Sequence, residues 1–185
     1  MKIIKLSLSL IVIIPVAIYG FNYFNLQKPL SDYMGSDNRN SGIKVTVHFQ
    51  NYIDTSKVVF DIDSIQNSSK MDVFRVLLNF SSLKKQSDYS EIILSYKGKP
   101  KFIVPGEYFK QLGIEFGTQN PIYTIRTFPE HIENLDGSNP YEKWTGGLLG
   151  VLQKQMEDFN DFHRRWYDSD MPNIEPGKNL VLDGL

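Results

Sequence analysis

The sequence predicts an α+β fold in which an N-terminal transmembrane helix precedes one small domain. Three observations support this prediction: an apolar segment near the start, stretches in which apolar and polar residues alternate, and segments with apolar residues at helical spacing. We expect a small antiparallel sheet of about four to five strands, in the order β-hairpin, helix, β-hairpin. The sheet packs against a helix near residues 69–85 and a long C-terminal helix near residues 146–167.

The apolar segment spans residues 6–26 and follows Lys2 and Lys5. As a helix with a rise of about 1.5 Å per residue it is about 30 Å long, which matches the hydrocarbon core of a bilayer. Because basic residues tend to stay in the cytoplasm, we expect residues 1–5 to form a cytoplasmic leader and residues 6–26 a single-pass signal anchor in a bacterial inner membrane. A cleaved signal peptide and a buried core helix are the alternative interpretations.

The rest of the chain is organised as a tether, a domain and a tail. Residues 27–42 are polar and rich in turn-forming residues, which predicts a flexible tether. Residues 43–170 form a periplasmic α+β domain with one core, and residues 171–185 form a loose tail. The net charge is −1 and no stripe of Lys and Arg is present, which argues against nucleic-acid binding. The absence of Cys excludes thiolate chemistry and zinc sites built from Cys.

Alternating patterns predict the strands. Residues 43–50 alternate between apolar and polar, and residues 57–62 supply the second strand of the first hairpin. Residues 92–96 and 101–104 form the second hairpin. Residues 122–128 have the composition of a strand and predict a fifth one.

Apolar residues at helical spacing predict the helices. Ser69 followed by Asp72 resembles a capping box at the start of the first soluble helix. Residues 107–112 predict a short helix that ends at Gly113. The last helix has the strongest pattern, an apolar stripe formed by Leu148, Leu149, Leu152, Met156, Phe159, Phe162 and Trp166.

The predicted binding residues lie at the start of this last helix and are Trp144, Gly146, Gly147 and Gly150. Glycine costs about 0.5–1 kcal/mol in a helix interior relative to alanine, so these glycines indicate a close approach by another group. Close contact with the domain's own sheet is the stronger interpretation, and a partner helix on a small-residue face is the functional alternative. A phosphate-binding loop is weaker still, because the lysine of a Walker motif is missing.

No catalytic signature stands out in the sequence. The candidates for acid–base chemistry are Asp158 with His163, or Glu130 with His131. A metal site would combine His131, His163, Glu157 and Asp161. None of them has the spacing of a metalloprotease motif, and no serine has the context of an acylation motif. We therefore predict no metal and no cofactor, and keep a periplasmic metal-dependent or acid–base hydrolase as an alternative function.

Four aromatic residues near the C-terminus suggest another alternative: Tyr141, Trp144, Trp166 and Tyr167. If exposed, they would form a platform for sugar rings, as in a cell-wall glycan-binding protein. Aromatic side chains more often pack in a core, which favours a structural role for them.

Five runs carry a family resemblance: Asp72–Leu78, Pro105–Phe109, Gln119–Pro129, Trp144–Gly150 and Gln155–Phe159. They resemble a family of small, N-terminally anchored bacterial envelope proteins without a known activity. The similar region covers about half of the chain. The resemblance implies a bacterial envelope protein and brings no catalytic residues with it.

These observations favour a membrane-anchored envelope protein that is not an enzyme. We expect its domain to bind another envelope protein or to take part in the assembly of a complex. The hydrolase and the glycan-binding protein are the alternatives.

Overall fold

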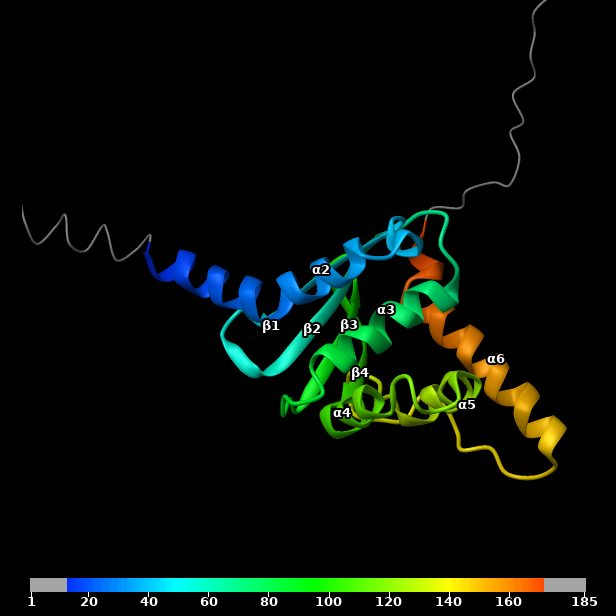
Figure 1. Cartoon of the computed structure of the whole chain (residues 1–185). Coiled ribbons are helices and arrows are strands. Elements are labelled where there is room, and N and C mark those ends of the chain that lie inside the picture. The colour runs from blue at the N-terminus through cyan, green and yellow to red at the C-terminus, as the bar shows by residue number, and fades with distance from the viewer. Residues whose placement is uncertain (1–12, 172–185) are drawn as a thin grey trace, which may run out of the picture.

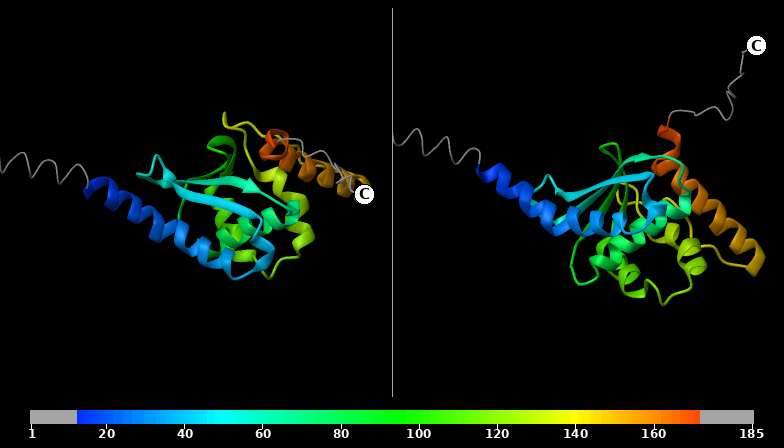
Figure 2. Two further views of the ribbon diagram at one scale, coloured as in Figure 1. Left: turned by 90° about the horizontal axis from the view of Figure 1, so that it is seen from above. Right: turned by 45° about the horizontal axis from the view of Figure 1, so that its top comes forward.

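The computed structural model describes residues 13–171, which form an α+β fold around one four-stranded sheet (Figure 1). The strands follow one another in the sheet in the order in which they occur in the sequence. They are β1 (Ile43–Gln50), β2 (Asp54–Ile65), β3 (Glu91–Tyr96) and β4 (Lys99–Pro105). The helices α3 (Lys70–Leu83) and α4 (Gly106–Glu115) pack against each other. The last helix, α6 (Leu148–Trp166), contacts β3 and β4. Figure 2 shows the N-terminal helix along one side of the molecule and α6 on another.

The sheet is mixed, and the prediction of a purely antiparallel sheet is wrong. Strands β1 (Ile43–Gln50) and β2 (Asp54–Ile65) form one antiparallel hairpin, and β3 (Glu91–Tyr96) and β4 (Lys99–Pro105) form the other. Between them β2 and β3 pair in parallel. The reason is α3 (Lys70–Leu83), which joins β2 to β3 as a crossover and so brings the chain back to the end of the sheet where β2 began.

The strands bury the residues that their patterns predict. In β1 the side chains of Ile43, Val45, Val47 and Phe49 are buried, while those between them are exposed or half-buried. A strand with one buried face alternates in this way. The central strand β3 is buried at nearly every position, because both its edges are paired and helices pack against it.

The N-terminal segment packs on the domain. Residues 13–22 are helical, a π-helical turn η1 (Tyr23–Gln27) follows, and α2 (Lys28–Gly35) continues the helix. Leu26 and Leu30 are fully buried in the same core as the sheet. The segment expected as a flexible tether, residues 27–42, is instead mostly helical: after α2 it contains the 3-10 turn η2 (Asn38–Asn40).

The predicted transmembrane anchor over residues 6–26 is contradicted. Among residues 13–171, no helix combines the length and the apolar character that a membrane crossing requires. The predictions of a single-pass anchor and of an inner-membrane location are therefore contradicted as well. The physical reason lies in the second half of the predicted span, where polar Asn22 bonds to the sheet and apolar Leu26 is buried in the core. Residues 1–12 and the predicted tail beyond Met171 lie outside the described residues.

Two side-chain amides join the N-terminal helix to the free edge of β1. Gln27 donates from Nε2 to the Val45 carbonyl oxygen (3.1 Å), and its Oε1 accepts from the Val47 backbone N–H (2.8 Å). Asn22 Oδ1 accepts from the Phe49 N–H (2.7 Å). In a π-helical turn, residues five apart lie on the same side of the helix, so η1 aligns the Asn22 and Gln27 amides along one strand.

The segment predicted as a fifth strand is a helix, α5 (Pro121–Thr127). Asn120 caps it, because its Oδ1 accepts from the Ile122 N–H at 3.0 Å, and Pro121 occupies the first turn. The ring of proline fixes φ at a value suited to a helix. Its missing N–H costs nothing in the first turn, because backbone N–H groups there have no partner within the helix, and the Asn120 side chain satisfies one of them. The cap therefore outweighs the strand composition of the residues that follow. The 3-10 turn η3 (Phe128–His131) continues from α5.

The remaining helices are near their predicted places. The capping box at Ser69 is confirmed, with the Ser69 and Asp72 side chains each accepting from the other's backbone N–H. The helix α4 (Gly106–Glu115) covers the predicted short helix. The long helix α6 (Leu148–Trp166) buries the aromatic residues of its second half, and the 3-10 turn η4 (Asp168–Asp170) follows it.

Two helical glycines have opposite surroundings. A methyl group on Gly113 would lie 2.2 Å from the Ser81 carbonyl oxygen, whereas nothing lies within 4 Å of one on Gly150. We expect Gly113→Ala to lower the free energy of unfolding by about 1–3 kcal/mol, and Gly150→Ala to raise it by about 0.5–1 kcal/mol. Urea unfolding followed by tryptophan fluorescence measures both. A destabilised Gly150→Ala variant would contradict the open surroundings of that residue.

The amide of Asn22 gives a second prediction. Asn22 is buried and bonds to the Phe49 N–H and the Tyr52 carbonyl oxygen. We expect Asn22→Ala to cost about 1–3 kcal/mol of stability, since it leaves both backbone groups without a partner. The control is Asn25→Ala, because the exposed Asn25 side chain bonds only within its own helix and its loss should cost less than about 0.5 kcal/mol. Equal effects of the two substitutions in chemical denaturation would refute this assignment.

Candidate functional site

The candidate site is a hollow at the start of α6. Trp144 precedes the helix, and its indole Nε1 donates to Asp158 Oδ2 at 2.6 Å, while the Lys154 ammonium lies 5.7 Å from the centre of the indole ring. These contacts hold the indole against the side of the helix. Trp144 thereby forms a wall of a hollow of about 240 Å³, whose other lining residues are Thr145, Gly147, Gly150, Val151, Gln153 and Lys154.

The glycines keep this surface open. Nothing lies within 4 Å of a methyl group built on Gly146, Gly147 or Gly150, so the domain's own sheet does not approach them. The interpretation that these glycines allow close packing on the sheet is therefore wrong. Gly146 has a φ of +129°, a backbone conformation that side chains other than glycine rarely adopt. It gives the chain the bend that leads from Trp144 into α6.

Two leucines lie between the hollow's Gly147 and Gly150 in the chain. Leu148 is 71% exposed and Leu149 is 81% exposed, although the sequence pattern placed both in the buried stripe of the helix. The stripe enters the core only from its second half onward, at Phe159, Phe162 and Trp166. Figure 1 shows the start of α6 extending away from the sheet, which explains why these leucines have no cover from the domain. The three glycines are the sequence signal that could have indicated this open end.

His163, one of the predicted catalytic candidates, belongs to the core. Its side chain is fully buried, its Nδ1 lies 2.8 Å from the Tyr167 hydroxyl, and Phe74 and Phe159 pack edge-on against its ring. Burial, and to a lesser degree the charge of Lys70, lowers the pKa of His163 to about 3, so the ring is neutral near pH 7. A neutral, enclosed imidazole does not meet a substrate.

His131 and Asp158 are also engaged in structural contacts. The His131 ring donates from Nδ1 to the Thr127 carbonyl oxygen at 2.8 Å and stacks on Tyr108 with 4.3 Å between ring centres. Asp158 holds the Trp144 indole. Within residues 13–171, no group of three or more His, Cys, Asp or Glu side chains is placed to hold a metal ion. The structure therefore does not bring the predicted catalytic candidates together.

The further carboxylates proposed as metal ligands have partners of their own. Glu157 pairs with Lys154 at 2.9 Å, and Asp161 accepts from the Tyr141 hydroxyl at 3.1 Å and pairs with Arg164. Glu157 and Lys154 are half exposed, so this ion pair contributes little to stability.

The aromatic residues do not form an exposed platform. Trp166 and Tyr167 are almost completely buried in the core, and Tyr141 is buried beside Phe102. Of the four, Trp144 alone is half exposed. A sugar ring would therefore find one indole rather than a row of aromatic side chains.

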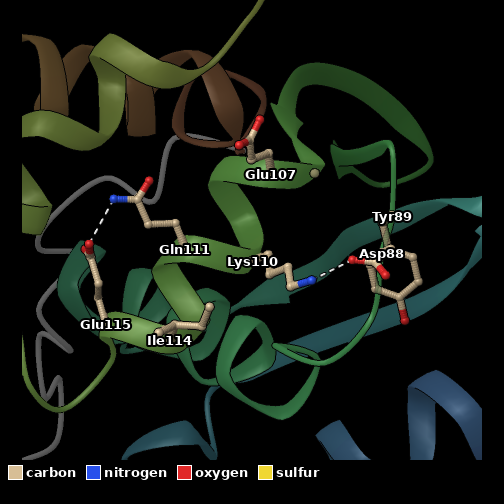
Figure 3. A pocket seen from close by; sticks show the side chains of 8 residues that line it. Asp88, Tyr89, Glu107, Lys110, Gln111, Ile114 and Glu115 are labelled. Carbon is tan, nitrogen blue, oxygen red and sulfur yellow. Dashed lines mark hydrogen bonds and ion pairs between the residues drawn. The ribbon is translucent and has the colours of Figure 1, made fainter.

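A second hollow, of about 500 Å³, lies beside α4 (Figure 3). Three of its four charged side chains have partners: Lys110 Nζ lies 2.6 Å from Asp88 Oδ1, and Gln111 Nε2 donates to Glu115 Oε1 at 2.8 Å. The Asp88 side chain is largely exposed to solvent, which screens the ion pair. This hollow is an open surface depression, and among the residues that line it no nucleophile faces a base. Sequence reasoning gave no indication of it.

The fold and the site together define a small α+β domain with an open apolar helix end. No protein-family model, curated protein or solved structure matches the chain. The resemblance to anchored envelope proteins therefore has no counterpart in these comparisons.

The buried His163 makes stability depend on pH. Its pKa is about 3 in the folded protein and about 6.5 when unfolded, so the unfolded state binds the proton first. We expect His163 to lower the free energy of unfolding by about 1.4 kcal/mol for each pH unit between about 6.5 and 3 as pH falls.

The control is His163→Gln, which retains a polar side chain without a titrating ring. Urea unfolding at a series of pH values from 7 to 4 should give a flatter dependence for this variant than for the natural protein. Parallel curves would show that His163 accepts a proton as readily in the folded state as in the unfolded one.

Proposed function

We propose that this protein is a non-enzymatic binding module whose partner protein contacts the start of α6. One observation supports the proposal above the others: Leu148 and Leu149 are exposed in the first turn of α6, which also carries the glycines that line the hollow. Exposed apolar side chains close together at one end of a helix are typical of a surface that another protein covers.

The site has the composition of an energetically important contact. Burying one leucine side chain contributes about 1.5–3 kcal/mol, so Leu148 and Leu149 together could supply several kcal/mol of binding free energy. Tryptophan is enriched among the residues that dominate interfaces. Because Asp158 already fixes the indole of Trp144, little side-chain freedom would be lost when a partner binds.

The shape of the hollow restricts the chemistry of the partner. Gly147 and Gly150 have no side chain, so an apolar side chain of the partner can approach the α6 backbone between Trp144 and Val151. Gln153 and Lys154 supply a polar rim. The proposed partner is therefore a protein with a protruding apolar side chain, and neither a hydrolase nor a glycan-binding function finds support in the described side chains.

Photocrosslinking tests this proposal. A photoreactive phenylalanine derivative in place of Leu149 should link the protein to one partner in the cells that produce it. The matched control is the same group in place of Leu83, a leucine at the end of α3 that is also exposed. An adduct that forms equally well from both positions, or from neither, would contradict the proposal.

The partner identified in this way can then be used for binding measurements. We expect Leu149→Glu to weaken the complex about 10- to 100-fold, since it places a charge in an apolar contact, whereas Leu83→Glu should leave the affinity unchanged. Gly150→Leu fills the hollow and should weaken binding while the circular dichroism spectrum stays that of the folded protein. Unchanged affinity in both Leu149→Glu and Gly150→Leu would refute this site.

A further inference from the structure

A second apolar surface lies at the other end of the molecule, on the N-terminal helix and the tip of the β1–β2 hairpin. We call it the N-terminal surface and define it by eight exposed side chains: Ile13, Ile14, Val16, Tyr19, Phe21, Phe24, Tyr52 and Ile53. Figures 1 and 2 show that the start of the helix extends beyond the hairpin and lies far from the start of α6. The N-terminal surface is therefore separate from the site proposed above.

This surface is more apolar than an isolated domain normally presents. Residues 13–17 are exposed on all sides of the helix, although each of them is apolar. A helix that is apolar all round is normally buried. The eight side chains are between 44% and 67% exposed, so together they offer on the order of 800 Å² of apolar surface. The largest apolar patch of a typical monomer measures only about 300–600 Å².

A groove gives the surface its shape. It has a volume of about 320 Å³ and lies between the helix and the hairpin tip, lined by Ala17, Ile18, Phe21, Tyr52, Ile53 and Thr55. The helix is fixed in place because the Asn22 amide bonds to Phe49 and Tyr52 backbone groups. A partner would therefore meet a preformed surface and lose little freedom in ordering it.

We propose that the N-terminal surface is the contact through which two copies of this protein associate. No charged residue occurs between Ile13 and Gln27 or between Gln50 and Ile53, so the apolar centres of two identical surfaces can face each other without repulsion between like charges. The charged groups at the border have opposite signs: Asp54 follows Ile53, and the Lys84 ammonium contacts the Asn25 carbonyl oxygen. A two-fold dimer pairs each patch with itself and requires this kind of self-compatibility. Because these side chains lie on more than one side of the helix, one contact would bury only part of the roughly 800 Å² per copy. Such an interface lies at the small end of the range for specific complexes and fits a reversible monomer–dimer equilibrium.

The edge of the surface also suits a protein partner. The side chains of Asn25, Asn51 and Thr55 are polar and uncharged and lie next to the apolar residues in the chain, and Asp54 adds one carboxylate beside Ile53. Protein interfaces commonly combine an apolar centre with a polar rim of this kind. In the dimer, aromatic side chains from the helix of one copy would fill the groove of the other.

Sedimentation of the full chain tests the proposal. We expect a monomer–dimer equilibrium, and a double variant, Phe24→Glu with Ile53→Glu, should raise the dissociation constant at least about 10-fold because it brings four carboxylates into the interface. Leu135→Glu is the matched control, since it also places a charge on an exposed leucine but in the loop beside β4, at the opposite edge of the sheet from β1, and it should leave the equilibrium unchanged. Circular dichroism verifies that each variant is folded.

Disulfide trapping provides an independent measurement, because the chain contains no natural Cys. A single Ile53→Cys variant should form disulfide-linked dimers on mild oxidation. Leu135→Cys should not, because Leu135 is an exposed leucine in the loop that pairs with β4, at the opposite edge of the sheet from β1. A protein that stays monomeric up to about 100 μM, or a dimer that the Phe24→Glu and Ile53→Glu changes leave intact, would overturn the proposal. A monomer that instead floats with phosphatidylcholine vesicles would also overturn it, and would assign the surface to lipid.

Discussion

The fold depends on how the N-terminal helix closes the edge of β1. The Gln27 amide bonds to the Val45 carbonyl oxygen and the Val47 N–H, which are the outward-facing groups on either side of Thr46. A residue of a parallel neighbouring strand would make the same two contacts, so the amide takes the place of a fifth strand. An uncovered edge strand would be a template for pairing with other chains. The π-helical turn is what allows Asn22 to continue this row of contacts to Phe49.

The covered edge of β1 and the aromatic core together restrict where a partner or ligand could bind. Phe74 packs against Phe128 and Phe159, and Phe60 packs against Phe80 and Trp166, so the interior is filled with rings. His163 is enclosed by this core. Two of the apolar surfaces that the fold leaves exposed are helix ends that reach beyond the core, at the start of α6 and at the start of the N-terminal helix.

The two proposed contacts have a joint consequence. Because the N-terminal surface and the start of α6 lie far apart, a dimer formed through the first leaves both copies of the second free. A partner with two binding elements could then engage both copies, and the second contact would form as an intramolecular step at a raised effective concentration. In this way a domain with one modest site per chain could bind a paired partner tightly without any catalytic group.

Local patterns in the sequence predicted the elements whose stabilising contacts are also local. The alternation from Ile43 to Gln50 predicted β1, and the Ser69–Asp72 capping box predicted the start of α3. These signals work because a strand repeats every two residues and a helix cap lies within one turn. The same reasoning failed for α5, where the cap at Asn120 outweighs the strand composition that follows.

The tertiary structure alone decided how the segments meet. The sequence could show that residues 6–26 are apolar, but hydropathy does not distinguish a bilayer from a protein core, and Asn22 finds its partner at Phe49, 27 residues away. Likewise, glycine residues mark the absence of a side chain without showing what lies opposite: Gly113 faces Ser81 at close range, whereas Gly150 faces open space. Composition and period are properties of neighbouring residues, while pairing, burial and openness depend on residues that are distant in the sequence and meet only in the folded chain.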